Sequence, residues 1–372
     1  MNTSFPALFP GMLLDSASRY AEDHVGQELQ GDPVRDLGWT ATIVPEEAGG
    51  VGGSLSDLAS IVEGLATHGL QLPVIETCAV VPLLLQAAGA ETATRWLEAV
   101  AEGSARIAPM TALSSTPDES TVLARHLDIG FELDGVVQGV DATLPATHYL
   151  VPAQLDGERA LFLVDAERVG APKTRYTTME GRRGADFVLD RLALPEGACI
   201  ARGAAARDAQ ARACDAALLL TAVDTVAALA TLIRQTVTHL QERRQFGVSL
   251  STFQVLRHRV ADMYVKYLGA KGQVIHCLHD HDEQAADLRR TLRLTKVSLA
   301  ESARACAESA IQMHGGMGVS EEVLATRIAQ RLIASEFRYG DRLLHVAQLL
   351  AAPTAPASAG QPSLSHQSGS TR

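Results

Sequence analysis

Three long stretches without glycine or proline constrain the fold of this chain more than any other feature. They cover residues 204–246, 248–268 and 273–314. Because helices in globular proteins average only about a dozen residues, these stretches predict unusually long helices. Long helices that pack against one another form a bundle. The sequence therefore predicts a helical bundle over residues 204–350.

The first part of the chain is also predicted to be helical. Apolar residues recur at helical spacing from Leu55 to Leu65, and Ser54 precedes them as a candidate N-cap. The apolar run that follows, VVPLLLQAAGAETATRWLEAVAEG, indicates more helix. We expect an N-terminal helical domain over residues 1–104.

Residues 105–203 follow a different pattern. Apolar residues alternate with polar residues or glycine from Leu127 to Leu133, which predicts a half-buried strand that ends in a turn at Asp134–Gly135. Two more strands are predicted in HYLVPAQ and RALFLVD, which are separated by LDGE. Proline and glycine recur until the long helices begin. We expect a middle β domain over this region.

The composition is that of an ordinary globular protein, and it excludes some functions. Of 372 residues, 47% are apolar and 20% are charged, which suits two or three domains with a large core. The net charge of −11 argues against a nucleic acid as partner, although local arginines can still bind a phosphorylated cofactor. The five cysteines are scattered without a CxxC pair, so we expect reduced thiols and no metal.

The two ends of the chain give further expectations. The first twenty residues lack a basic stretch followed by a long apolar core, and we find no apolar run of membrane-spanning length. We therefore expect a cytoplasmic protein with no membrane partner. Residues 351–372 are rich in Ala, Pro, Ser and Gly, so we expect a disordered tail.

One candidate binding cluster lies in ERRQFGVSLSTFQ, where a predicted helix ends. Arg243 and Arg244 offer forked donors that suit phosphate. Phe246 can cover an aromatic ring, and Gln254 can hydrogen-bond a polar ring edge. The alternative is structural, because arginines favour helix C-termini and Gly247 can cap the helix.

A second cluster is the glycine corner in IQMHGGMGVSEE. A predicted helix ends at Gly315 and Gly316, and a third glycine follows at Gly318. Bare backbone lets a ligand approach closely, and its N–H groups can bind anionic oxygens. A plain corner between two helices is the alternative.

The two clusters occur in order, and together they resemble the acyl-CoA dehydrogenase family. ERRQFGVSLSTFQVLRHRVADM is similar to that family's RxxFG…FQ…ADM segment, and AIQMHGGMGVSEE is similar to its QxxGGxG segment. LGWTATIVPEEAGG resembles its amino-terminal PEEYGG region. The resemblance covers roughly residues 35–345. It implies an α+β multidomain fold with an N-terminal helical domain, a middle β domain and a C-terminal four-helix bundle.

The resemblance also implies a function. Members of the family form homo- or heterotetramers, bind FAD and oxidise an acyl-CoA thioester between its α and β carbons. A carboxylate base removes the α proton while the flavin accepts the β hydrogen as hydride. Carried over by motif, the basic helix end of one protomer and the glycine corner of another would hold one FAD, and the β domain would contact its flavin ring. The residues so implied are Arg243, Phe246 and Gln254, then Gln312, Gly315 and Gly316, and in the β domain Met110 and Thr111.

The sequence departs from the family at the catalytic base. The two usual base positions correspond to Tyr339 and Ala217, and a neutral phenol is a poor base. Asp224 lies about two helical turns beyond Ala217 on the same side, in an apolar stretch. It is a candidate base, or a structural Asp paired with a nearby Arg or hydroxyl. Glu336 is a weaker candidate. The family's TEPxxGSD stretch is also incomplete in APMTALSSTPDEST.

These departures suggest a subunit that acts with a related partner. Both base positions lack a carboxylate while the FAD residues are retained, as expected for one subunit of a heterotetramer. The branch of the family with this arrangement handles steroid-derived and other bulky acyl-CoA substrates. Two alternatives stay open. The chain is a self-sufficient dehydrogenase that uses Asp224, or a non-catalytic scaffold of this fold that binds no flavin.

Overall fold

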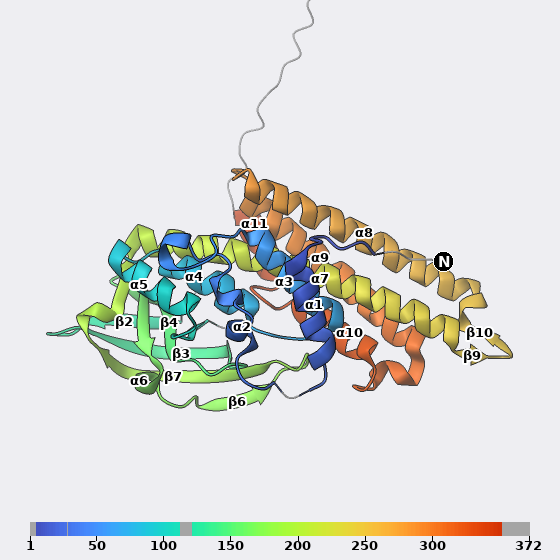
Figure 1. The fold of residues 1–372 in the computed structure, drawn as a ribbon, viewed down its shortest axis with the longest axis horizontal. Coiled ribbons are helices and arrows are strands. Elements are labelled where there is room, and N and C mark those ends of the chain that lie inside the picture. The colour runs from blue at the N-terminus through green and yellow to red at the C-terminus, as the bar shows by residue number, and fades with distance from the viewer. Residues whose placement is uncertain (1–4, 28, 112–120, 352–372) are drawn as a thin grey trace, which may run out of the picture.

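The chain folds into three parts that follow one another in sequence (Figure 1). The computed structural model describes residues 5–27, 29–111 and 121–351. Short helices come first, an eight-stranded sheet follows, and long helices complete the chain. The predicted tail lies outside the described residues, except for its first residue, Ala351.

The N-terminal part is helical, as predicted. Ser54 caps α3 with a capping box, in which its hydroxyl accepts from the backbone N–H of Asp57 while the Asp57 carboxylate accepts from the backbone N–H of Ser54. The elements are α1 (Met12–His24), α2 (Pro33–Asp36), the short 3₁₀ turns η1 (Trp39–Ala41) and η2 (Glu46–Ala48), α3 (Leu55–His68), the π-helix η3 (Ile75–Val80), α4 (Val81–Leu85) and α5 (Ala90–Ala101).

The sheet has the order β6-β7-β3-β2-β4-β5-β8, with β1 paired to β4. The predicted turn between the second and third predicted strands is confirmed, because β4 and β5 pair antiparallel around Asp156 and Gly157. The elements are β1 (Ile107–Pro109), β2 (Val122–His126), β3 (Phe131–Asp141), β4 (His148–Leu155), β5 (Glu158–Asp165), the helix α6 (Ala166–Val169), β6 (Thr174–Thr177), β7 (Arg183–Leu194), the 3₁₀ turn η4 (Glu196–Ala198) and β8 (Cys199–Arg202).

The first predicted strand was placed wrongly. The turn lies at residues 127–130, with Ile129 85% exposed, and Asp134–Gly135 lies inside β3. A Cβ at Gly135 would lie 2.6 Å from the carbonyl oxygen of Thr121. The glycine therefore serves a close approach of two strands, which local sequence does not distinguish from a turn.

Three long helices and the shorter α10 form the predicted bundle, in which α7 and α9 each pack against the other three. A small hairpin connects α7 to α8. The elements are α7 (Gly203–Glu242), β9 (Arg244–Gln245), β10 (Val248–Ser249), the 3₁₀ turn η5 (Leu250–Thr252), α8 (Gln254–Asp282), α9 (Leu288–His314), the 3₁₀ turn η6 (Gly315–Val319), α10 (Leu324–Ser335) and α11 (Arg342–Ala351).

Helix α8 does not end where its glycines suggested. It continues through Gly269 and Gly272, and the chain instead breaks between Asp282 and Leu288, where Gln284 has a φ of 51°. A single glycine costs a helix only about 1 kcal/mol, and packing along a long helix can exceed that cost. Glycine-free stretches therefore predicted long helices correctly but misplaced this boundary.

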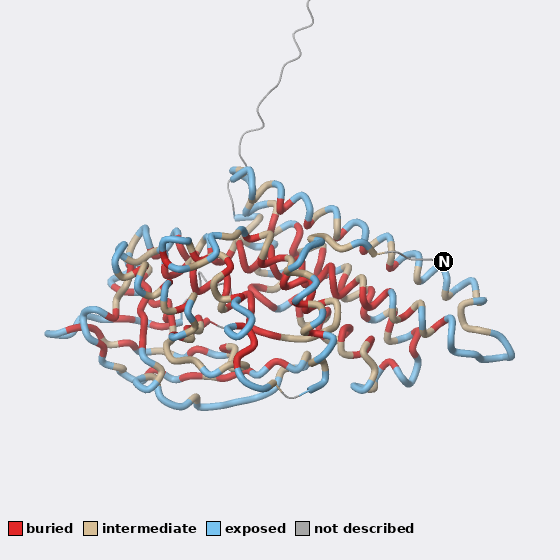
Figure 2. The backbone as a smooth tube through the Cα atoms, viewed as in Figure 1, coloured by how far each residue is buried: buried red, intermediate tan, exposed pale blue. Residues whose placement is uncertain are grey.

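Helix α7 is the central element of the fold (Figure 2). It packs against α3, α8, α9, α10 and β5, and most of its middle is buried. It is long and apolar enough to cross a membrane, contrary to our reading of the sequence, but 94% of its most apolar window is buried inside the protein. Those apolar side chains fill the main core, while a second core lies within the β domain.

The contact between α1 and α3 depends on one glycine. A Cβ at Gly64 would lie 2.8 Å from both the Ala17 Cβ and the Leu14 carbonyl oxygen, whereas a Cβ at Gly269 on α8 would meet nothing within 4 Å. We predict that Gly64→Ala destabilises the protein by about 1–3 kcal/mol through overpacking. Gly269→Ala should stabilise it by about 0.5–1 kcal/mol. Urea unfolding of both variants tests this, and equal effects would contradict it.

Candidate functional site

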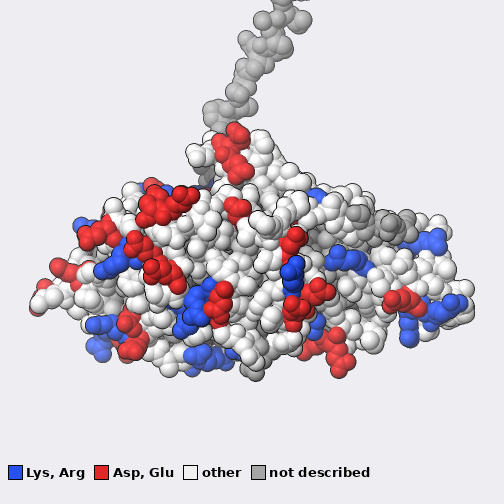
Figure 3. All heavy atoms as spheres, in the orientation of Figure 1, with Lys and Arg blue, Asp and Glu red and all other residues white. Residues whose placement is uncertain are grey.

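The first predicted cluster lies at an exposed end of the bundle. Helix α7 ends at Glu242, and the hairpin β9–β10 turns through Phe246 and Gly247 with φ values of 55° and 79°. Phe246 is 89% exposed. Arg243, Arg244 and Gln254 are also exposed. Basic side chains gather at this end of the molecule (Figure 3). The arrangement leaves charged donors and an aromatic ring available to a ligand.

The second predicted cluster offers open backbone. Helix α9 ends at His314, and a Cβ at Gly315 or Gly316 would meet nothing within 4 Å. Gln312 is exposed one turn earlier. Gly318 differs, because a Cβ there would lie 2.3 Å from the carbonyl oxygen of Ile311. The first two glycines therefore suit the approach of a ligand, while the third serves packing.

One chain brings the two clusters together. The imidazoles of His239 on α7 and His314 on α9 stack with their centroids 4.2 Å apart. His314 is 7% exposed, and neither ring nitrogen has a partner among the described residues. Burial and the neighbouring His239 lower its pKa to about 4. Helices α7 and α9 run in the same direction, so both clusters lie at the same end of the chain, whereas the resemblance divides them between two protomers.

The β-domain residues lie elsewhere. Met110 and Thr111 are buried just after β1, and the Met110 N–H donates to the Leu150 carbonyl at 2.7 Å. Met110 belongs to the core of the β domain, and Figure 1 shows the labelled strands of that domain and the β9–β10 hairpin on opposite sides of the molecule. Residues 112–120, which hold most of the incomplete TEPxxGSD stretch, lie outside the described residues.

Tyr339, at the first base position, is buried and firmly held. It lies between α10 and α11 with a φ of 54°, and its hydroxyl donates to Glu76 Oε1 at 2.8 Å. Burial, followed by the charge of Glu76, raises the pKa of Tyr339 well above its usual value. Lys296 Nζ donates to the carbonyls of Ser335 and Arg338, and His345 Nε2 donates to the Tyr339 carbonyl at 3.0 Å. These contacts fix the tyrosine in its strained conformation.

Glu76 is the centre of a buried ion cluster that the sequence analysis missed. Its Oε1 lies 2.9 Å from Arg338 and 3.4 Å from Arg182, and Arg182 also lies 2.9 Å from Asp141. Burial alone would raise the pKa of Glu76, but Arg182 and Arg338 bring it below the usual value. The cluster joins η3, the β domain and the α10–α11 segment. Glu76 is a lone acid in an apolar run, the same signal that singled out Asp224.

The other candidate bases are paired with arginines. Asp224 makes a two-point ion pair with Arg331, whose Nε lies 3.1 Å from Oδ2. Burial would raise the pKa of Asp224, but Arg331 lowers it below the usual value. This is the structural pairing that the sequence left open. Glu336 accepts from Arg304 at 2.7 Å. Ala217 is fully buried.

The arrangement limits what this site can do chemically. Arginines hold Glu76 and Asp224 and lower the pKa of both, and a carboxylate with a lowered pKa is a weak base. Glu76 Oε2 has no partner among the described residues, yet it belongs to the same cationic cluster. The described residues contain no group of three His, Cys, Asp or Glu side chains suited to a metal ion.

Comparisons with known proteins agree with the fold. Residues 12–104 match the model of the acyl-CoA dehydrogenase N-terminal domain, and residues 211–348 match that of the C-terminal domain. The acyl-CoA dehydrogenase IpdE2 of Mycolicibacterium smegmatis is 27% identical, over 77% of this chain and 75% of that protein.

Two solved structures are similar along most of the chain. The ChsE4–ChsE5 complex from Mycobacterium tuberculosis gives a TM-score of 0.78 at 20% identity, over 93% of this chain and 99% of that one. A variant of the steroid acyl-CoA dehydrogenase Tcur3481–Tcur3483 gives 0.77 at 23% identity, over 91% and 95%. The two domain matches and the shared order of helices, sheet and bundle show that this chain belongs to the acyl-CoA dehydrogenase family.

Proposed function

We propose that this chain is the non-catalytic subunit of a heterotetrameric, FAD-dependent acyl-CoA dehydrogenase. The observation that carries the proposal is the buried contact between Tyr339 and Glu76 at the base position. A phenol with a raised pKa donates a hydrogen bond there, and its acceptor is a carboxylate that two arginines stabilise. Neither group is suited to take a proton from a thioester.

The ion cluster also opposes substrate binding at this position. Glu76, Arg182, Arg338 and Tyr339 are all nine-tenths or more buried. A substrate that displaced them would have to separate paired charges inside the protein, which costs several kcal/mol. The ion cluster therefore holds the three parts of this chain together at the position where a catalytic dehydrogenase would bind its substrate.

The exposed clusters at the bundle end fit a flavin dinucleotide. Arg243 would pair with its diphosphate, the open backbone at Gly315 and Gly316 would accommodate it closely, and Gln312 and Gln254 would hydrogen-bond it. Phe246 would cover a ring. When bound, the flavin supplies hydride acceptance, which side chains cannot provide. Because Met110 and Thr111 belong to the β domain and not to the bundle, this clamp would serve the flavin of a neighbouring subunit.

The partner and the substrate class rest on the relatives. ChsE4 and ChsE5 form a complex of two different subunits, and Tcur3481–Tcur3483 is a steroid acyl-CoA dehydrogenase. Both resemble this chain along more than nine-tenths of its length. We infer that the partner is a related dehydrogenase subunit that carries the base, and that the substrate is a steroid-derived or similarly bulky acyl-CoA.

The proposal predicts that activity needs a second gene product. Expressed alone, the chain should not oxidise acyl-CoA esters, because no described carboxylate at the base position is available. Expressed with a related dehydrogenase subunit that carries the base, the complex should carry FAD and reduce a dye acceptor with a steroid-type acyl-CoA. A lone, flavin-loaded chain with full turnover would refute the proposal.

A second prediction concerns cofactor retention by the complex. Arg243→Gln should weaken FAD binding about 10- to 100-fold, as expected for loss of one charge-assisted hydrogen bond to a phosphate. Arg244→Gln is the matched control, because Arg244 already donates to the Gly247 carbonyl at 3.3 Å. Flavin fluorescence during dilution measures the affinity. Equal losses in both variants would show that the arginines act only through general charge.

The alternative of a self-sufficient enzyme that uses Asp224 makes a different prediction. If Asp224 is structural, Asp224→Asn should destabilise the protein by about 3–5 kcal/mol, since Arg331 is left buried without its partner. Asp215→Asn, on the same helix but paired with the half-exposed Arg289, should cost less than about 1 kcal/mol. Urea unfolding compares them, and lost turnover with unchanged stability in Asp224→Asn would favour the alternative.

The contribution of Asp224 to stability should also depend on pH. Its pKa in the folded protein is below the usual 3.8, so its contribution is present above that value and is lost as the pH falls through the folded pKa. The stability difference between wild type and Asp224→Asn should therefore shrink in acid. A difference that grows below about pH 4 would contradict this assignment.

A further inference from the structure

Helix α8 carries a second apolar face that no residue of the described chain covers. Ala261, Val265, Leu268, Gly272 and Ile275 follow one another at alternating spacings of four and three residues. This is the heptad spacing with which one helix packs along another. All five residues are exposed, and Val265, Leu268 and Ile275 are 67%, 49% and 50% exposed. We call this face the α8 seam.

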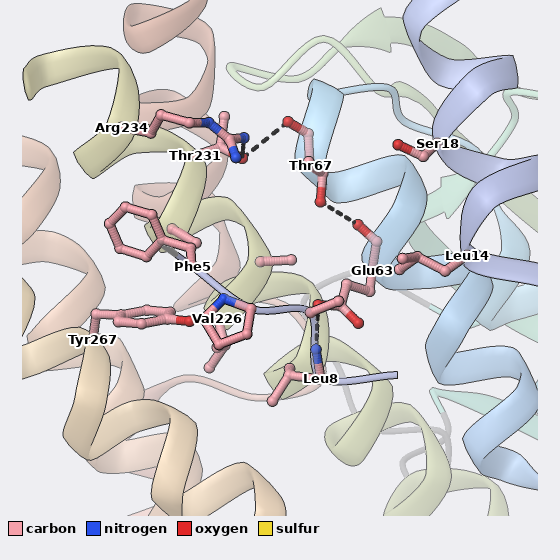
Figure 4. A pocket seen from close by; sticks show the side chains of 14 residues that line it. Phe5, Leu8, Leu14, Ser18, Glu63, Thr67, Val226, Thr231, Arg234 and Tyr267 are labelled. Carbon is pink, nitrogen blue, oxygen red and sulfur yellow. Dashed lines mark hydrogen bonds between the residues drawn. The ribbon is translucent and has the colours of Figure 1, made fainter. Parts of the chain in front are cut away.

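The other face of α8 is already packed against this chain. Its buried residues are Met263, Tyr267, Ala270, Val274, Cys277 and Leu278. The N-terminal segment lies on this inner face, where Phe5 packs edge-on against Tyr267 at 5.2 Å and the Leu8 N–H donates to Glu63 of α3 at 2.7 Å (Figure 4). A helix that is apolar on two faces and packed on only one is expected to have a further partner.

Gly272 allows a partner to approach the seam closely. A Cβ at this position would meet nothing within 4 Å, so the packing within this chain does not require glycine here. A glycine inside a helix costs about 1 kcal/mol relative to alanine. The open backbone at Gly272 would instead receive a large side chain from another helix.

The seam is complementary to itself when two copies of α8 run antiparallel. If Leu268 of one copy lies against Gly272 of the other, the same register sets Val265 against Ile275. A large side chain then fills the space that each glycine leaves. A parallel pair would set Leu268 against Leu268 and leave a void at Gly272.

The charges at the two ends of α8 favour the same orientation. Exposed Arg257, His258 and Arg259 lie near the start of the helix, and exposed Asp282 and Glu283 lie at its end. The antiparallel register brings the basic end of each copy beside the acidic end of the other, whereas a parallel pair would bring like charges together. Such complementarity selects a second copy of this chain over an unrelated apolar partner.

We propose that two copies of this chain associate through their α8 seams as an antiparallel helix pair. The contact is isologous, with its two-fold axis between Leu268 and Gly272. It goes beyond the proposed function and does not depend on it, because the seam residues take no part in catalysis or cofactor binding. In a heterotetramer of two different subunits, it would join the two copies of this chain.

Sedimentation of the full chain tests the contact. Wild type should be dimeric by about 100 µM, as expected for a small interface. Leu268→Glu should raise the dissociation constant at least about tenfold, because each dimer would then bury two unpaired carboxylates. Leu123→Glu changes a 64% exposed leucine on β2 and is the matched control, which should leave the dimer unchanged. A wild type that stays monomeric, or a dimer that Leu268→Glu does not weaken, would overturn the proposal.

Cysteine cross-linking tests the orientation. Chains with Val265→Cys and chains with Ile275→Cys, mixed and oxidised, should form a disulfide between copies. Val265→Cys alone should not, since its two copies would lie about 15 Å apart along the helix axes, too far for a disulfide. Wild type is the background control for the five native cysteines. Cross-linking of Val265→Cys alone, or none in the mixture, would refute the antiparallel register.

Discussion

The buried ion cluster around Glu76 is the interaction on which the rest of the structure depends. It connects the π-helix η3, the β domain through Arg182 and Asp141, and the segment before α11 through Arg338 and Tyr339. Buried charges are tolerated only when partners surround them, so each member needs the others in place. The three parts of the chain are therefore fixed to one another around Glu76.

In the proposed subunit, Tyr339 at the expected base position would separate the fold of the family from its chemistry. The long helices, the sheet and the order of the parts are those of the family, and the apolar core that sets them is intact. Tyr339, which has a positive φ, occupies the position that corresponds to the base. Hydrogen bonds from Lys296 and His345 hold the backbone carbonyls of Arg338 and Tyr339. Burial, followed by the charge of Arg338, lowers the pKa of Lys296 to about 7. The strained backbone of Tyr339 and the buried charges beside it cost free energy. The contacts that this cluster makes between the domains offset that cost.

The architecture was largely predictable from sequence, because it depends on repeating patterns. The glycine-free stretches correctly predicted a helical bundle. The Ser54 cap and the β4–β5 turn were also placed correctly. Features that depend on a contact with a residue far away in the sequence could not be predicted from local sequence patterns. Gly135 signalled a turn, but it permits two strands to approach. Asp224 was singled out correctly as unusual, yet its partner Arg331 lies 107 residues away, and Glu76 acquires its meaning only beside residues more than a hundred positions distant.

The separation of the two predicted cofactor regions has a consequence for cofactor occupancy. Met110 and Thr111 follow β1 in the β domain, whereas Arg243, Gly315 and Gly316 lie at the shared end of α7 and α9 in the bundle. A ligand site completed only between molecules follows mass action in protein as well as in ligand. Its occupancy falls when the protein is diluted, even in excess cofactor, so assembly and loading become one equilibrium. A chain without chemistry of its own would then still decide whether its neighbour is active.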